Sequence, residues 1–90
     1  MEIKDSKILV IGGAGFIGSF VVSELLKHHV KEVVIYDNFA RGNKEYLKEQ
    51  LKDERCSVFP FGGDIREIDI LDTAIQGKDY VISLAAMWLL

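Results

Sequence analysis

The stretch Lys7-Ile-Leu-Val-Ile-Gly-Gly-Ala-Gly-Phe-Ile-Gly18 decides the fold of this chain. Its first five residues form an apolar run that ends at glycines, which predicts a short strand buried on both faces. Gly12, Gly15 and Gly18 then stand three residues apart. From residue 16 to about residue 29, apolar residues recur at helical spacing and predict a helix. The glycines therefore occupy the turn that joins a buried strand to a helix.

The rest of the chain continues this alternation of strands and helices. Apolar runs predict further strands at Val33–Tyr36, Ser57–Phe61 and Asp79–Leu84. Helices are predicted from Lys44 to about Asp53 and from Glu67 to about Gln76, where Gly77 is a stop signal. Such alternation implies right-handed crossovers and a parallel sheet with helices on both faces. We predict an α/β fold, a Rossmann-like doubly wound parallel sheet, incomplete, with element order β-α-β-α-β-α-β and strand order 3-2-1-4.

Apolar spacing also predicts which side of each helix is buried. The expected inward residues are Ile17, Phe20, Val21, Leu25 and Leu26 in the first helix, Tyr46, Leu47 and Leu51 in the second, and Ile68, Leu71 and Ile75 in the third. Pro60 falls in the third strand. Because proline cannot donate to a central ladder, this strand is expected at an edge, as the order 3-2-1-4 requires.

Composition narrows the classes of protein that remain. The chain has 90 residues, enough for one domain at most, and 49% are hydrophobic while 28% are charged, which is typical of a globular protein. A net charge of −3 argues against nucleic acid as a partner. The lone Cys56 permits no internal disulfide and has no metal-site partners, so we expect no metal and a cytoplasmic location. The apolar stretch Tyr80–Leu90 is too short to span a membrane.

The spaced glycines predict a phosphate-binding loop. Gly12 permits the tight turn, Gly15 lets the backbone approach a pyrophosphate, and Gly18 lets the helix pack closely on the sheet. The first helical amides, at Phe16 and Ile17, then point at the phosphates. A simple strand-to-helix turn would also use one or two of these glycines, so the motif alone is weak.

Asp37 provides the second half of the signal. It lies 19 residues beyond Gly18, at the end of the second predicted strand, where dinucleotide-binding domains carry an acid. A carboxylate there accepts hydrogen bonds from both adenosine ribose hydroxyls and repels a 2′-phosphate, which favours NAD over NADP. Two alternatives stay open: Asp37 could cap a turn, and Arg41 could accommodate the phosphate of NADP.

Gly12-Gly-Ala-Gly-Phe-Ile-Gly18 resembles the signature of the extended short-chain dehydrogenase/reductase family, in particular its NAD-dependent nucleotide-sugar epimerases and dehydratases. Tyr36–Gly42 and Gly63–Arg66 are similar to the family's segments after the second and third strands, and the spacing agrees as far as Leu84-Ala-Ala86. Ile11 and Ser83 depart from the family, which usually has Thr and often His at these places.

The resemblance implies a role for each matching residue. The pyrophosphate would lie on Gly12, Gly15, Phe16 and Ile17, the adenosine ribose on Asp37 and Asn38 with Arg41 and Gly42 nearby, adenine on Asp64 and Ile65, and the middle of the cofactor on Leu84, Ala85 and Ala86. The Asp64 carboxylate would accept from the exocyclic amine of adenine. From the residues alone, Asp64 could instead cap the following helix, and Ala85-Ala86 could simply be packing residues.

The resemblance also shows what these residues lack. The family's chemistry needs a Tyr with a Lys four residues later, and the residues four after Tyr36, Tyr46 and Tyr80 are Ala, Gln and Leu. We therefore expect residues 1–90 to be the N-terminal part of a dinucleotide-binding domain, without the catalytic and substrate-binding regions, and not catalytic alone.

Two alternatives to the epimerase or dehydratase remain. The same glycine loop occurs in NAD(P)-dependent reductases and dehydrogenases of non-sugar substrates, and it would also serve a non-catalytic dinucleotide-binding module. In the order 3-2-1-4 the fourth strand is an open edge, which makes it a candidate surface for self-association.

Overall fold

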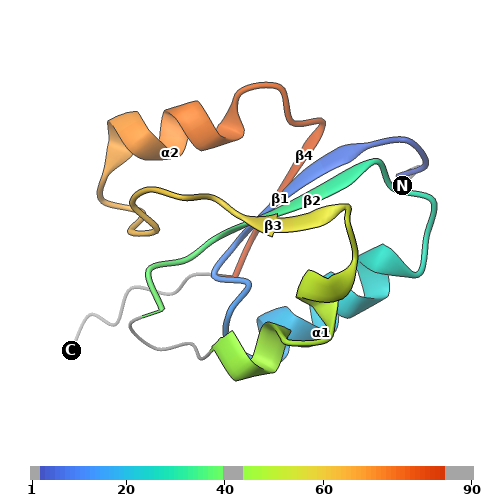
Figure 1. The fold of residues 1–90 in the computed structure, drawn as a ribbon. Helices are drawn as coiled ribbons and strands as arrows, with labels where there is room; N and C mark the ends of the chain where they lie inside the picture. The colour runs from blue at the N-terminus through green and yellow to red at the C-terminus, as the bar shows by residue number, and fades with distance from the viewer. Residues whose placement is uncertain (1–2, 40–43, 85–90) are drawn as a thin grey trace.

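The computed structural model describes residues 3–39 and 44–84. One parallel sheet contains β1 (Lys7–Ile11), β2 (Glu32–Tyr36), β3 (Cys56–Val58) and β4 (Tyr80–Ser83), in the order β3-β2-β1-β4. Helix α1 (Phe16–Leu26) lies on one side of the sheet and α2 (Ile68–Ile75) on the other (Figure 1). The predicted α/β class and strand order 3-2-1-4 are confirmed. No helix within the described ranges is both long and apolar enough to cross a bilayer.

The register of the strands brings their carboxyl ends together. Ile11 of β1 stands opposite Tyr36 of β2 and Ser83 of β4. The amide of Gly12 donates to the carbonyl of Tyr36 at 2.9 Å, and the amide of Leu84 donates to the carbonyl of Ile11 at 2.8 Å. Because all strands run parallel, the segments that follow β1, β2 and β4 all leave the sheet at the carboxyl ends of the strands. Ligands of open α/β sheets bind at this end.

Alternate residues of β1 and β2 divide the core between the two faces of the sheet. On the α1 face, Ile8 and Val10 pack with Val22 and Leu25 of the helix. On the α2 face, Leu9, Ile11, Val34 and Tyr36 pack with Ala74. The two central strands are therefore buried on both faces, as their continuous apolar runs predict.

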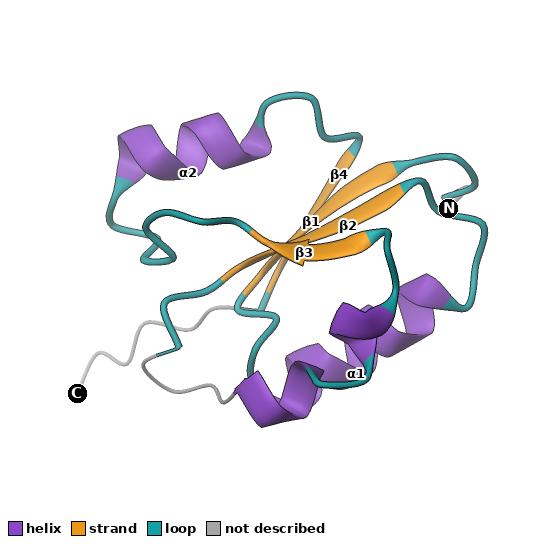
Figure 2. Ribbon diagram, in the orientation of Figure 1, coloured by secondary structure: helices purple, strands orange, loops and turns teal. Residues whose placement is uncertain are grey.

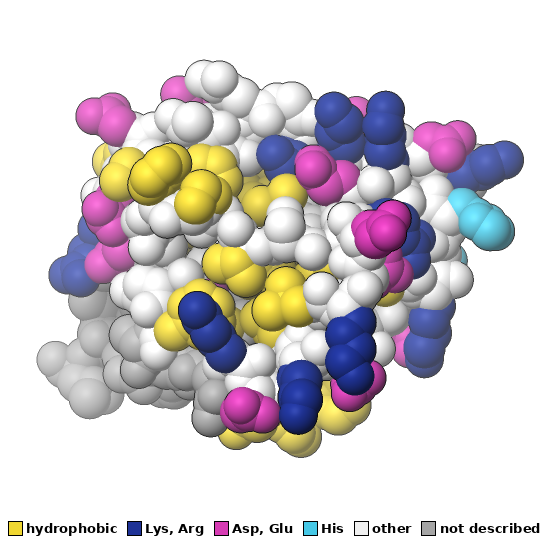
Figure 3. Space-filling view, viewed as in Figure 1, with side chains coloured by type: hydrophobic (Ala, Val, Ile, Leu, Met, Phe, Trp, Pro, Cys, Tyr) yellow, Lys and Arg dark blue, Asp and Glu magenta, His cyan; other side chains and the backbone are white. Residues whose placement is uncertain are grey.

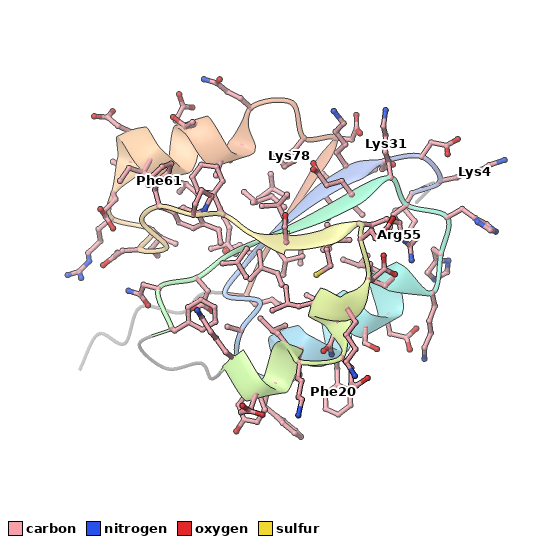
Figure 4. All side chains as sticks on the ribbon, in the orientation of Figure 1. Lys4, Phe20, Lys31, Arg55, Phe61 and Lys78 are labelled. Carbon is pink, nitrogen blue, oxygen red and sulfur yellow. The ribbon has the colours of Figure 1, made fainter. Side chains whose placement is uncertain are left out.

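The predicted buried face of α1 is confirmed in part. Leu25 is buried, and Val21 and Leu26 are half-buried against the core, as expected. The prediction is wrong for Ile17 and Phe20, which are 70% and 59% exposed, whereas Gly18, Ser19 and Val22 complete the buried side. Phe20 lies on the side of α1 away from the sheet (Figure 4). The helix is apolar nearly all round, so spacing alone does not set its rotation. The close approach of Gly18 to the glycine loop sets it instead. The helix also ends at Leu26, short of the predicted residue 29.

The single helix predicted from Lys44 to Asp53 is also wrong. The segment forms two short 3₁₀ helices, η1 (Lys44–Leu47) and η2 (Gln50–Lys52), which Figure 2 shows beside α1. Leu47 is fully buried, but Tyr46 and Leu51 are exposed, against expectation. The side-chain amide of Gln50 donates to the carbonyl of Ser19 at 3.0 Å. Two fixed points close together, Leu47 in the core and Gln50 on α1, favour tight turns over one continuous helix.

The second half of the chain matches the prediction in order but not in detail. The third strand is only Cys56–Val58, and Pro60 lies beyond it in a bend, although the strand is at the sheet edge as expected. In α2 the core-facing residues are Ile70, Leu71 and Ala74, whereas Ile68 is 73% exposed and Ile75 37%. Gly77 follows the helix with φ +76°, which confirms the predicted stop.

Candidate functional site

The glycine loop turns sharply between β1 and α1. Gly12 has φ +81°, a backbone conformation that favours glycine, so its predicted role in the turn is confirmed. A Cβ at Gly18 would lie 2.6 Å from the oxygen of Gly12 and 2.7 Å from the Cα of Gly13. Gly18 therefore lets α1 approach the backbone of the loop itself, rather than the sheet as predicted.

Gly15 differs from Gly18 because it borders open space. A Cβ at Gly15 would have no heavy atom nearer than the oxygen of Gly12 at 3.9 Å. Gly15 is also the residue before α1, so it has no side chain with which to cap the first helical amides. Phe16 and Ile17, which begin the helix, have exposed side chains. The positive end of the helix dipole at this uncapped turn is suited to an anion such as a phosphate.

Asp37 connects the end of β2 to this loop. Its Oδ2 accepts from the backbone amide of Ala14 at 3.1 Å, and its Oδ1 accepts from the amide of Phe39 at 2.7 Å. The second bond is the turn-capping role that the sequence left open. The first places the carboxylate beside the glycine loop, so the two predicted halves of the motif are in direct contact.

The segment after β3 packs against the end of β2, beside Asp37. Gly63 has φ +100°, and a Cβ on it would overlap the amide nitrogen of Asn38 and the carbonyl carbon of Asp37. The hydroxyl of the fully buried Tyr36 donates to the carbonyl of Asp64 at 3.1 Å. Tyr36 and Gly63 were not predicted as parts of the site. The adjacent glycines at 62 and 63 were the available signal, because two φ-positive residues after a strand indicate a sharply shaped loop.

Three donors of Arg66 hold the carboxylate of Asp64. The Arg66 side chain donates from Nε to Oδ1 at 3.0 Å and from Nη2 to Oδ2 at 2.6 Å, and the Arg66 amide donates to Oδ1 at 2.8 Å. The hydrogen bonds from the Arg66 side chain, and then from its backbone, lower the pKa of Asp64 to about 2. The residue before α2 is Glu67, not Asp64, so the helix-cap alternative for Asp64 is wrong.

The remaining predicted site residues divide into two groups. Asn38 is exposed next to Gly63, Ile65 packs at the margin of the core on the α2 face, and Leu84 follows β4 with 37% of its surface exposed. Arg41, Gly42, Ala85 and Ala86 lie outside the described residues. The structure thus brings together the glycine loop, the end of β2 and the segment after β3, three regions that are far apart in sequence.

Comparison with known proteins adds to this geometry. Residues 9–90 match the 3-beta hydroxysteroid dehydrogenase/isomerase family. UDP-glucuronic acid decarboxylase 3 of Arabidopsis thaliana is 47% identical over 52 residues, which are 58% of this chain and 15% of the plant protein.

Two solved structures resemble the fold. Pen from Bacillus thuringiensis superposes with a TM-score of 0.78 and 31% identity over 99% of this chain and 27% of its own. The Bordetella bronchiseptica enzyme WbmF, in complex with NAD⁺ and UDP, superposes with a TM-score of 0.74 and 28% identity over 94% of this chain and 24% of its own. This chain therefore spans about a quarter of the length of these two proteins. With the match over residues 9–90, the chain belongs to the 3-beta hydroxysteroid dehydrogenase/isomerase family, of the extended short-chain dehydrogenase/reductase type that its glycine loop indicates.

Proposed function

We propose that this chain binds NAD, as the N-terminal part of the dinucleotide-binding domain of an NAD-dependent nucleotide-sugar epimerase or dehydratase. The observation that carries the proposal is the convergence of the glycine loop, Asp37 and Asp64 at the carboxyl edge of the sheet. A dinucleotide needs an anion site beside a ribose site and then a base pocket, and these three regions follow one another in that order.

Each region has the chemistry for its part of the ligand. We assign the pyrophosphate to the first amides of α1, at Phe16 and Ile17, in the loop formed by Gly12, Gly15 and Gly18. The ribose would bind to Asp37 and Asn38, adenine to Asp64 and Ile65, and the middle of the cofactor to Leu84. The family resemblance adds Arg41 and Gly42 to the ribose site, and Ala85 and Ala86 to the middle of the cofactor site. The open space at Gly15 and the uncapped helix dipole support the first assignment.

The preference for NAD over NADP rests on charge. The Asp37 carboxylate, which would accept from the ribose hydroxyls, would repel a phosphate on the same ribose. Arg66 pairs with Asp64 and balances its charge, so this preference rests on Asp37. The complex of WbmF with NAD⁺ and UDP agrees with this choice of cofactor and with a nucleotide-sugar substrate.

The residues present indicate what the protein contributes and what the cofactor contributes. When bound, the cofactor supplies a hydride acceptor that takes a hydride from a sugar carbon and returns it. Residues 1–90 contribute the binding of phosphates, ribose and adenine, but no Tyr stands four residues before a Lys among them. The chain alone is therefore expected to bind the cofactor without turning over a sugar.

A second candidate function is a dehydrogenase or reductase of a non-sugar alcohol or ketone. The description of the matching family, which names hydroxysteroids, favours this candidate. Both candidates use the same cofactor site, so they differ only in the substrate region. A non-catalytic dinucleotide-binding module is the third candidate, and net turnover of NAD by a longer chain would distinguish the second from the other two.

Location and assembly belong to the same proposal. Burial raises the pKa of the Cys56 thiol to about 11, which makes the thiol unreactive. A cytoplasmic location stays a prediction from the single cysteine in the sequence. Among the described strands β4 pairs only with β1, and Val81 is 43% exposed. Self-association through this edge stays a prediction, checked by the mass of the chain in solution.

The direct test is calorimetric titration of the folded 90-residue chain with NAD, NADP and ADP. We expect NAD to bind more tightly than NADP, and ADP to compete with NAD because it carries the adenosine and both phosphates. A chain that has the circular dichroism of a folded α/β protein but binds none of the three would refute the proposal.

A further inference from the structure

We propose that Tyr36 is a positioning residue that makes the site selective for adenine over other bases. This inference rests on the proposed function, since it assumes that Asp64 accepts from the exocyclic amine of adenine. Tyr36 does not touch the ligand in this scheme. It acts by fixing the 62–64 loop, and with it the orientation of Asp64.

Tyr36 is placed for this role by burial and by its single polar atom. It is the last residue of β2 and the largest fully buried side chain in the described part of the protein. Its ring packs near that of Phe59, with centroids 6.0 Å apart. Burying a hydroxyl is costly unless it is hydrogen-bonded, and this one donates to the carbonyl of Asp64 at 3.1 Å, 28 residues away in sequence. A phenylalanine would serve the core equally well, so packing alone does not explain the hydroxyl.

The loop is shaped around that hydroxyl. A Cβ at Gly62, which has φ +64°, would lie 2.7 Å from Cγ2 of Ile70 in α2 and 2.8 Å from the hydroxyl oxygen of Tyr36. On its other side, Gly63 lies directly against the backbone of Asp37 and Asn38. The loop therefore lies between the side chains of Tyr36 and Ile70 and the end of β2. Tyr36→Phe removes the hydrogen bond to Asp64 and leaves the packing contacts in place.

The orientation of Asp64 matters because little of its carboxylate is left for a ligand. A carboxylate has about four acceptor positions, and the amide, Nε and Nη2 of Arg66 provide three donors to it. About one position remains, enough for one proton of an exocyclic amine. Hypoxanthine has a carbonyl oxygen in place of that amine, so this position cannot donate and its oxygen is repelled by the carboxylate. Hypoxanthine does donate from N1–H, but that donor is on the neighbouring ring atom, so the contact made by the amine is lost.

The test compares NAD with nicotinamide hypoxanthine dinucleotide, in which a carbonyl oxygen replaces the exocyclic amine and the adjacent N1 carries a hydrogen. By calorimetry the natural chain is expected to bind NAD about tenfold or more tightly than the hypoxanthine analogue, the worth of a hydrogen bond to a charged group. Tyr36→Phe keeps the ring and removes the hydroxyl, and is expected to reduce that ratio to about threefold or less. Tyr80→Phe, the same change at the first residue of β4, which is paired with Ile8 at the other end of the sheet, should leave the ratio unchanged.

The possible outcomes separate this inference from the proposed function. If Tyr36→Phe weakens both dinucleotides by the same factor, or neither, the residue is merely structural and the inference is overturned. If the natural chain binds no NAD, the proposed function fails and the inference fails with it.

Discussion

The backbone of Gly63 lies directly against the backbone of Asp37. A Cβ at Gly63 would lie 2.5 Å from the carbonyl oxygen of Asp37, and would overlap the carbonyl carbon beside it. Asp37 in turn accepts a hydrogen bond from the amide of Ala14 in the glycine loop. The loop after β3 and the loop after β1 are thus connected through the end of β2. A change at Gly63 is expected to disturb the whole candidate site, not one side of it.

Gly63→Ala is expected to destabilise the fold more than the matched change Gly77→Ala. Both glycines have positive φ, +100° and +76°, so both variants carry backbone strain. A Cβ at Gly77 has nothing within 4 Å, whereas one at Gly63 meets backbone. Overpacking of this kind adds about 1–3 kcal/mol to the loss. Urea denaturation followed by circular dichroism measures the difference, and equal losses in the two variants would show that the loop can move aside.

Gly15→Val is expected to abolish dinucleotide binding in a chain that still folds. The Cβ position is open, so the cost to stability should be about 1 kcal/mol, that of a poor residue at the start of a helix. The added side chain occupies the space where the pyrophosphate would approach. Calorimetry with NAD, beside a urea melt, measures both effects. A folded Gly15→Val chain that binds NAD normally would refute the assignment of the loop.

Gly18→Ala is the control for that variant, because it is expected to affect stability more than binding. Its Cβ would lie 2.6 Å from the oxygen of Gly12, so α1 would be forced away from the loop. Here we expect the free energy of unfolding to fall first and binding to weaken only as a consequence. Both changes add a side chain to the same motif, so their contrast separates a ligand contact from a packing contact.

The sheet could be predicted from the sequence because its central strands are apolar throughout. The predicted β1 matches the observed Lys7–Ile11, and the order 3-2-1-4 follows from the alternation of elements. The rotation of α1 could not be predicted. Phe16, Ile17 and Phe20 are apolar yet exposed, so the pattern of hydrophobic residues does not distinguish the buried side. A backbone contact at Gly18 decides it, and such contacts do not appear in a periodicity.

The candidate site was predicted as a list of residues but not as an arrangement. The glycine spacing and the position of Asp37 indicated a nucleotide site, and Asp64 was included only through the resemblance. That Asp64 lies beside Asp37 depends on Tyr36 and on two φ-positive glycines. These are interactions between residues more than 20 positions apart, which local patterns do not contain. Likewise, the pairing of Asp64 with Arg66 depends on a side-chain conformation.

Asp37→Ala is expected to weaken NAD binding about tenfold and to narrow the gap between NAD and NADP. The loss follows from removing acceptors for the ribose hydroxyls, and hydrogen bonds to a charged group are worth about 1.5–3 kcal/mol. The variant also loses the bonds to the amides of Ala14 and Phe39, so its stability must be measured in parallel.

Asp37→Asn is the matched control, because it keeps the shape and one acceptor oxygen while removing the charge. It should raise the affinity for NADP relative to that for NAD, even if it weakens NAD binding less than Asp37→Ala does. Calorimetric titration of both variants with both dinucleotides gives the comparison. Unchanged affinity for NAD in Asp37→Ala would remove Asp37 from the site.

Arg55 joins the start of β3 to the end of α1. Its Nη2 donates to the carbonyl of Leu26 at 2.6 Å and its Nη1 to that of His28 at 2.8 Å. Asp53 holds the guanidinium in place, since it accepts from Nε at 3.0 Å and from Nη2 at 2.7 Å. Both side chains are 31% exposed, and Figure 4 shows Arg55 beside the turn that leads into β3.

This ion pair is expected to make stability depend on pH in the acid range. The hydrogen bond from the Arg55 side chain is the main cause that lowers the pKa of Asp53 to about 2, from about 3.9 in an unfolded chain. Stabilisation by the pair is therefore complete above about pH 4 and is lost as the pH falls through 2. Asp53→Asn should lower the free energy of unfolding at pH 7 by up to about 1 kcal/mol, with a difference from the natural chain that shrinks towards pH 2.

Glu49→Gln is the control. It breaks the exposed pair with Lys52 and should change the free energy of unfolding little at any pH. Urea denaturation at pH 7, 4, 3 and 2 measures the three curves, and a difference for Asp53→Asn that stays constant across them would show that the ionised pair does not hold α1 to β3.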